Sequence, residues 1–362
     1  MASEVPRQPT LDEVVETQLL PKTVKRSVQR LSRAKTAPVG VSHGTAAQRV
    51  EAARGFIQAG RAAGDPRTLG YAEAELAGLP ETGALGVETL VLRATIEQSR
   101  HRFDAARDLL DSALHESPAH LQARLTRATI EYVRGNLASA RTDCAALRES
   151  APAVSAICSA IGDSLSGNNT NALRTLESVS DPALRGWALS IAGEVHEQQG
   201  SLASAVRSYI ASLALGHDLH TAVALAGALI AQQQWRQAEA VLQPLPSTDA
   251  VLLARWIIAR RLQRDSTGLK NQLVDRFAAA QARNELLHAR EAALFTLEQG
   301  ESSRALMLAR QNWKDQREPA DLRILALAAK ASGDAAAAAT VQDWLSHTGL
   351  RDVRVLRALG KS

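Results

Sequence analysis

A segment of five residues occurs twice in this chain at a fixed separation. Arg93–Glu97 reads RATIE, and the same five letters return at Arg127–Glu131, 34 residues later. Further identities at that separation are Ala106 with Ala140, Arg107 with Arg141, and Pro118 with Pro152. A period of roughly 20 to 50 residues is typical of repeat architectures, whose units bury their apolar faces by stacking on neighbours. From about residue 46 onward, apolar residues recur three and four positions apart, which predicts helix after helix.

The 34-residue helix–turn–helix period resembles the tetratricopeptide repeat (TPR). That family has a small residue at position 8, glycine near position 15 and alanine at position 20 of each repeat. Periods that begin at Val87, Leu121, Gly186, Leu219, Leu286 and Pro319 place Ala94, Ala128, Gly193, Ala226, Ala293 and Ala326 at position 8. Such residues let the two helices of a pair approach to about 8 Å. Glycine at position 15 ends the first helix in a left-handed cap.

The resemblance implies an all-α fold, an α-solenoid of stacked antiparallel helix pairs in a TPR-like right-handed superhelix. We expect two parts: an N-terminal extension over residues 1–45, partly helical and basic, and a helical repeat domain over residues 46–362. The repeat domain would hold about nine pairs, of which six carry the spacing well and three fit it loosely. Leu350–Leu359 is expected to form a terminal helix.

Composition excludes several classes of protein. Aromatic residues make up 3% of the chain, too few for a single-strand nucleic-acid binder built on stacking. A net charge of +4 over 362 residues is too weak a field for a protein that coats nucleic acid. No apolar run is long enough to span a membrane. The chain also lacks the nucleophile-elbow, P-loop and dinucleotide-binding motifs, so we expect neither catalysis nor a cofactor.

Six positive charges without an acidic residue lie within Lys22–Lys35 of the N-terminal extension. Val24, Val28 and Leu31 fall on one face if this segment is helical. One interpretation is a basic amphipathic segment that makes weak contact with an acidic surface or an anionic lipid. The other is a solvated first helix or linker.

The two cysteines are the strongest candidates for covalent chemistry. Cys144 and Cys158 lie at equal distances on either side of Ala151, next to Pro152. If two helices turn there, the thiols stand level and can form a disulfide, which would indicate an oxidising compartment such as the periplasm. The alternative is two buried free cysteines. No signal peptide precedes residue 46, so we expect a periplasmic protein whose leader was removed or a cytoplasmic one. Abundant arginine and alanine suggest a bacterial source.

Histidine and acidic residues give no clear metal or catalytic site. His217 and His220 are one helical turn apart, but no neighbouring residue supplies a third ligand. An enzyme with a cryptic metal site at these two histidines is therefore the weakest of three functional interpretations. Glu194 and Glu197 are also one turn apart and are interpreted as a solvated face rather than an acid–base pair. We therefore expect no bound metal.

Function is expected on the concave groove that the first helices of the repeats line in the resembled family. The candidate partner-binding residues at these positions are Thr95, Gln98, Gln122, Thr129, Tyr132, Trp187, Glu194, Gln198 and His220, together with Glu88 and Arg323. Tyrosine and tryptophan suit binding surfaces because they offer large areas with few rotatable bonds. The leading hypothesis is a non-catalytic scaffold that binds a peptide or helix of a partner protein. The alternative is a regulatory domain that senses a small ligand or peptide in the same groove.

Overall fold

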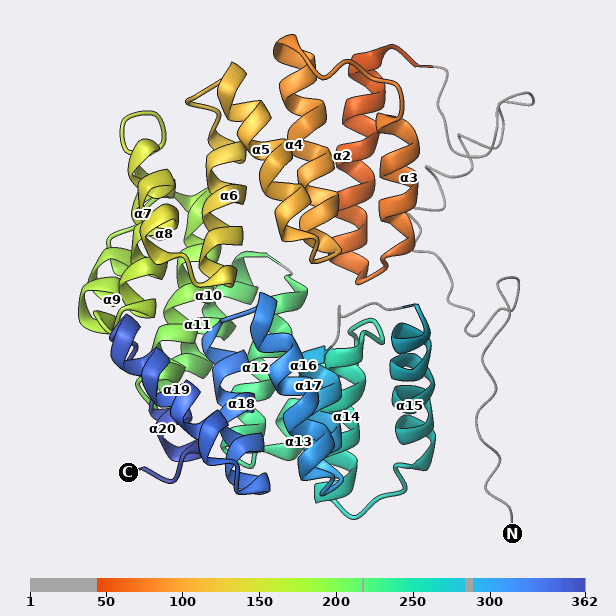
Figure 1. Ribbon diagram of the computed structural model, residues 1–362, viewed down its shortest axis with the longest axis vertical. Helices are drawn as coiled ribbons and strands as arrows, with labels where there is room; N and C mark the ends of the chain where they lie inside the picture. Colours follow the sequence, from red (N-terminus) through yellow and green to blue (C-terminus); the bar gives the residue numbers. More distant parts are fainter. Residues whose placement is uncertain (1–43, 217, 284–288, 362) are drawn as a thin grey trace.

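The computed structural model describes residues 44–216, 218–283 and 289–361, and within these ranges every regular element is a helix (Figure 1). The helices are α2 (Ala46–Ala63), α3 (Arg67–Leu76), α4 (Gly83–Ser99), α5 (Phe103–Glu116), α6 (Leu121–Arg134), α7 (Leu137–Ala146), α8 (Pro152–Leu165), α9 (Asn169–Glu177), α10 (Pro182–Gln198), α11 (Leu202–Leu215), α12 (Leu219–Ala231), α13 (Trp235–Leu242), α14 (Asp249–Arg261), α15 (Thr267–Ala282), α16 (Ala289–Glu298), α17 (Ser302–Asp315), α18 (Pro319–Ser332), α19 (Ala335–Thr348) and α20 (Val353–Ala358). The predicted all-α class is confirmed. The basic segment 22–35 lies outside the described residues.

The described helices form nine antiparallel pairs, from α2–α3 to α18–α19, followed by the short helix α20. We call the first helix of each pair the A helix and the second the B helix. Apolar side chains gather in a succession of clusters shared by neighbouring pairs, rather than in one central core. This is the packing expected of a repeat array, in which each unit contacts mainly its neighbours. None of the described helices is long and apolar enough to cross a membrane.

Small residues stand where the two helices of a pair cross. At position 8, Ala94, Ala128, Ala226, Ala293 and Ala326 have no exposed surface, and Gly193 is also buried. The alanines at position 20 in the first five of these periods, Ala106, Ala140, Ala205, Ala238 and Ala305, are equally buried. A larger side chain at these points would hold the helix backbones apart. The small residues at positions 8 and 20 therefore recur in the sequence where the backbones of the two helices come closest.

Gly193 provides a direct test of this close contact. A Cβ atom there would lie 2.3 Å from the buried ring of Tyr209, whereas one on Gly227 of α12 would meet no atom within 4 Å. We expect Gly193→Ala to lower the free energy of unfolding by about 1–3 kcal/mol through overpacking. Gly227→Ala should raise it by about 0.5–1 kcal/mol, because alanine favours the helix. Urea unfolding of both variants measures the two effects, and equal shifts would contradict the packing argument.

The turn from A helix to B helix has the same backbone conformation in all nine described pairs. One residue in each turn is left-handed, with positive φ: Gly64, His101, Gly135, Gly167, Gly200, Gln233, Gln263, Gly300 and Gly333. Glycine adopts this conformation freely, whereas other L-residues pay about 1–2 kcal/mol. Three pairs therefore keep the turn in spite of its cost, at His101, Gln233 and Gln263.

The A helices lie on the inner face of the array. Each A helix from α2 to α18 packs against the next A helix, whereas no two B helices among those described come into comparably close contact. Closer spacing of the A helices bends the array so that they line its concave side. Any partner that enters the groove must therefore meet side chains of the A helices.

The curvature also brings the end of the chain back to its first half (Figure 1). Helix α20 packs against α10. The backbone N–H of Arg317, in the loop before α18, donates a 2.7 Å hydrogen bond to the carbonyl oxygen of Val133 in α6. The inner face is thus bounded at one side by contacts between residues far apart in the sequence.

Candidate functional site

An ion pair joins two neighbouring A helices on the inner face. Nε2 of His220, in the first turn of α12, lies 2.8 Å from Oε1 of Glu194 in α10. The hydrogen bond from His220 to Glu194 raises the histidine pKa to about 9, opposed by partial desolvation and reinforced by the charges of Glu318 and Asp218. His220 is therefore charged at neutral pH. Its side chain is 72% exposed, so the pair faces solvent inside the groove.

The pH dependence of stability checks this pair. Since the folded pKa of His220 lies above its ordinary value of 6.5, the stabilisation is complete below pH 6.5 and is lost as the pH rises through about 9. An exposed pair contributes about 0.5–1 kcal/mol. We expect wild type to lose this much more stability than His220→Gln between pH 6 and pH 10, measured by urea unfolding. Identical pH profiles would contradict the assignment.

A second, more buried network stands on α16, α17 and α18. Nε of Arg290 lies 2.6 Å from Oδ1 of Asp321, and the same guanidinium pairs with Glu318. Asn312 donates a 2.7 Å hydrogen bond to Asp321, whose own carboxylate accepts from the backbone N–H of Glu318. Burial alone would lower the pKa of Arg290, but Asp321 and Glu318 outweigh it and raise that pKa well above its usual value. The arginine is held permanently charged.

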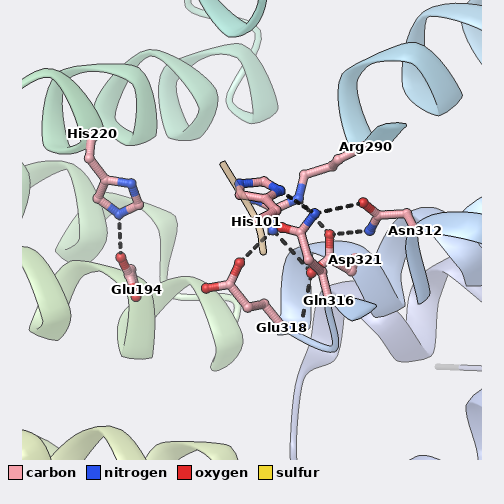
Figure 2. Close-up of polar contacts among 8 residues, drawn as sticks. All are labelled: His101, Glu194, His220, Arg290, Asn312, Gln316, Glu318 and Asp321. Carbon is pink, nitrogen blue, oxygen red and sulfur yellow. Dashed lines mark hydrogen bonds and ion pairs between the residues drawn. The ribbon is translucent and has the colours of Figure 1, made fainter. Parts of the chain in front are cut away.

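The turn between α4 and α5 reaches this network across 215 positions of sequence. Nδ1 of His101 lies 3.1 Å from Nε2 of Gln316, which also donates a 3.1 Å hydrogen bond to Asn312. Figure 2 shows these side chains together with the Glu194–His220 pair. The His101 ring stacks on Phe103, with a centroid separation of 5.4 Å. The left-handed residue of this turn therefore also makes a long-range contact.

We call the residues of Figure 2 the central polar site: His101, Glu194, His220, Arg290, Asn312, Gln316, Glu318 and Asp321. The exposed groups carry both signs of charge, with His220 positive and Glu194 and Glu318 negative. Such a site can hold a charged or polar segment by ion pairs and hydrogen bonds. Within the ranges that the structure describes, no three histidine, cysteine, aspartate or glutamate side chains are grouped to hold a metal ion. His217 is outside those ranges.

The arrangement of a glutamate and a histidine on successive A helices occurs a second time. Nε2 of His120, the N-cap residue of α6, lies 3.2 Å from Oε1 of Glu88 in α4. Glu88 also pairs with Arg54 of α2 at 2.8 Å. Glu88 is at position 2 of its period and Glu194 at position 9, so the two pairs lie at different levels of their A helices.

The structure places the nine candidate partner-binding residues in three different environments. Thr95, Tyr132 and Gln198 are buried, Gln98, Trp187 and Glu194 are half-buried, and Gln122, Thr129 and His220 are exposed. Gln122 donates to Thr126, and Thr129 donates to the carbonyl oxygen of Leu125, so both are engaged within their own helix. Glu194 and His220 are the two that the structure joins directly.

The buried candidates serve packing rather than the groove surface. The Tyr132 hydroxyl donates a 3.1 Å hydrogen bond to the carbonyl oxygen of Cys158, and a Cβ on Gly162 would lie 2.5 Å from that hydroxyl. Burial raises the pKa of Tyr132 to about 12. Trp187 packs against the apolar cluster shared by α8, α9 and α10. Tyr132, at position 12 of its period in α6, therefore points toward α8 and not toward the groove.

Sequence reasoning missed most of the Arg290 network. Arg290 stands at position 5 of the period that begins at Leu286, which is a groove position in the resembled family, so this residue carried a usable signal. No sequence feature marked His101 or Gln316 as a site residue, because the two lie in turns of different repeats. Their contact depends on the curvature of the whole array.

Cys144 and Cys158 are joined as a disulfide between α7 and α8, with Cα atoms 5.5 Å apart. Both residues are fully buried beside Tyr132. Ser155 of α8 donates a 2.7 Å hydrogen bond to the carbonyl oxygen of Cys144, which fixes the same two helices. The bond lies within the solenoid wall and not in the groove.

Comparison with known proteins identifies the fold. The crystal structure of the APC/C hetero-tetramer Cut9–Hcn1 aligns with 93% of this chain and 80% of that chain, with a TM-score of 0.50 and 12% identity. The P58(IPK) TPR domain aligns with 87% of this chain and 96% of that one, with 13% identity, but its TM-score of 0.24 supports no argument. The predicted TPR-like α-solenoid is confirmed. No protein-family model matches the sequence. No curated protein matches it either.

Proposed function

We propose that this protein is a non-catalytic interaction scaffold that binds a segment of a partner protein on its inner face. The central polar site carries the proposal, because it exposes paired charges of both signs on A helices where a groove ligand would lie. The Glu194–His220 pair contributes little to the stability of the fold, because ion pairs that are exposed to solvent are weak. A solenoid that binds along its concave surface uses such groups for orientation and specificity.

The partner segment would be extended or helical and would carry charges of both signs. His220 offers positive charge to its acidic side chains, and Glu194 and Glu318 offer negative charge to its basic ones. Charge complementarity of this kind selects partners and speeds encounter more than it raises affinity. The neighbouring Glu88–His120 pair extends the same pattern along the groove.

Chemical crosslinking and affinity capture from the native host test this function. The double variant Glu194→Ala with His220→Ala removes the exposed pair of the site. The matched control is Glu239→Ala with Arg264→Ala, which removes an exposed pair at 2.6 Å between α13 and the α14–α15 loop. We expect wild type and control to recover the same partner, and the site variant to recover about tenfold less, a difference of about 1.4 kcal/mol. Equal recovery with all three proteins would refute binding at this site.

A regulatory domain that senses a small ligand in the same groove is the competing function. A thermal-shift screen separates the two, because a small ligand at about 100 times its Kd stabilises the folded protein by about 2.7 kcal/mol. A reproducible hit lost in the Glu194→Ala, His220→Ala variant would favour the sensor. A silent screen together with a captured protein would favour the scaffold.

A further inference from the structure

The last short helix docks on the end of an A helix that lies far away in the sequence. Helix α20 packs against α10, and Arg354 of α20 pairs with Glu197 in the last turn of α10, across 157 positions. One pair earlier in the array, Asn169 of α9 donates a 3.2 Å hydrogen bond to the carbonyl oxygen of Arg351. These contacts hold the end of the chain on its first half.

The Glu197–Arg354 pair is enclosed. The sequence favours a solvated face for Glu197, but its side chain is only 15% exposed, and that of Arg354 is 23% exposed. Nε and Nη2 of Arg354 donate to the two carboxylate oxygens of Asp352 at 3.1 and 2.7 Å, and Asp352 has no exposed surface. Only Nη1 is left for Glu197. One guanidinium therefore serves two enclosed carboxylates, and Asp352 holds the larger share of it.

Little else in this contact stabilises a negative charge on Glu197. Among the described residues, Arg354 is the one hydrogen-bond donor to its carboxylate. The ring of Tyr209 lies against Gly193, one turn before Glu197 on the same face of α10, but the Tyr209 hydroxyl is buried without a hydrogen-bond partner. Negative charge is also unfavourable at the C-terminal end of a helix. The ionised carboxylate is thus poorly compensated for the water that it has lost.

The side chains that face Glu197 from the surrounding elements carry both signs of charge. They are Glu194 of α10, Tyr209 of α11, Arg323 of α18, Asp352 before α20 and Arg354 of α20. Burial raises the pKa of Glu197 to about 7, reinforced by the charges of Glu194 and Asp352 and opposed by Arg354 and Arg323. Glu197 therefore keeps a proton in about half of the molecules at pH 7.

We propose that the contact between α10 and α20 is a proton-dependent joint, which closes with a proton on Glu197 and loosens when that proton passes to water. In the closed joint the neutral carboxyl still accepts the hydrogen bond from Arg354, and Asp352 balances the guanidinium charge. After ionisation, Glu197 regains its water only when α20 separates from α10. The inference goes beyond the scaffold function and does not depend on it.

Closure of the joint should weaken as the pH rises. The pKa of Glu197 is about 7 in the closed joint and returns toward its ordinary value of 4.5 when the side chain meets water. The closed joint therefore holds a proton that the open joint has already released. Closure is favoured fully below pH 4.5, and this advantage is lost as the pH rises through 7. Between pH 5 and pH 8 the closing equilibrium should fall by at most about 70-fold.

Amide hydrogen exchange on the full chain tests the joint. The amides of Val355 and Leu356 in α20 donate to the carbonyl oxygen of Asp352. After correction for intrinsic exchange, we expect their protection in wild type to fall by about 10- to 70-fold from pH 5 to pH 8. Amides around Gly64 should keep their protection. Protection in α20 that stays constant or increases over this range would overturn the proposal.

Two variants separate the proton on Glu197 from a general effect of charge. Glu197→Gln keeps an acceptor for Arg354 but has no proton to lose, so α20 should stay equally protected at pH 5 and pH 8. The matched control is Glu301→Gln, which removes one charge from an exposed pair with Arg304 and should respond to pH like wild type. If Glu197→Gln responds like wild type, Glu197 does not control the joint and the proposal fails.

A titration of wild type alone keeps the test decisive if Glu197→Gln does not fold. Carbon-13 NMR of protein labelled at the glutamate carboxyl carbons should show one carboxyl that titrates near pH 7, far from the ordinary value of 4.5. If every glutamate titrates below about pH 5.5, Glu197 is already ionised in the closed joint and the proposal is wrong. A carboxyl that titrates near pH 7 without any change in the protection of α20 would overturn it as well.

Discussion

Asp321→Ala is expected to destabilise the protein by about 3 kcal/mol, because it leaves the guanidinium of Arg290 without its principal partner. The Asp321 side chain has no exposed surface, and Arg290 is largely enclosed. Removing one member of such a pair costs far more than the pair contributes, since the remaining charge is left desolvated and uncompensated. The same change also removes the acceptor of Asn312 and of the Glu318 backbone N–H, which weakens the start of α18.

Urea unfolding monitored by circular dichroism measures this loss. The control is Glu301→Ala, which removes an exposed pair with Arg304 and should change stability by less than about 0.5 kcal/mol. Asp321→Asn should fall between the two, because the amide keeps the shape and one acceptor but not the charge. If Asp321→Ala and Glu301→Ala cost the same, the Arg290 network does not hold the last pairs together.

Reduction of the Cys144–Cys158 bond is expected to destabilise the protein by about 3 kcal/mol. The two residues are 14 positions apart, and opening a loop of that length restores chain entropy to the unfolded state by about this amount. The effect should be concentrated in α7 and α8, because stability in a repeat array is largely local. We expect the bond to form in an oxidising compartment such as the periplasm, where thiols are not kept reduced.

The check compares wild type with Cys144→Ala, Cys158→Ala, each with and without dithiothreitol. Wild type should lose stability on reduction, and the variant should show no response to dithiothreitol. Titration of denatured, unreduced wild type should find no free thiol. Two free thiols per chain would refute the bond and remove the argument for an oxidising compartment.

The fold could be predicted because its determinants are local and repeated. Alanine at positions such as Ala94 and Ala128 reports close helix contact, and no larger residue can replace it there without separating the backbones. The sequence predicts the left-handed turn where glycine occupies it, as at Gly135 and Gly200. It does not predict the turn where His101 or Gln233 takes the same conformation. A cost of about 1–2 kcal/mol at such a residue is tolerated because the stacked pairs dictate the turn.

The site was less predictable for two physical reasons. Groove positions were numbered on an ideal repeat, and the actual rotation of α6 directs Tyr132 into the wall beside Gly162. Glu194 and His220, on successive helices with regular repeats, are both groove positions of the resembled family, and the structure joins them directly. The contacts of His101, Arg317 and Arg351 depend on small rotations summed over many pairs, which no local pattern records.

The contact between Arg317 and Val133 has a consequence for the order of synthesis. The carbonyl oxygen of Val133 is made 184 residues before its donor, the backbone N–H of Arg317. At elongation rates of about 5–20 residues per second, that carbonyl waits for roughly 10–40 s. A premature stop anywhere in this interval would release a shorter chain in which the C-terminal end of α6 never receives this contact.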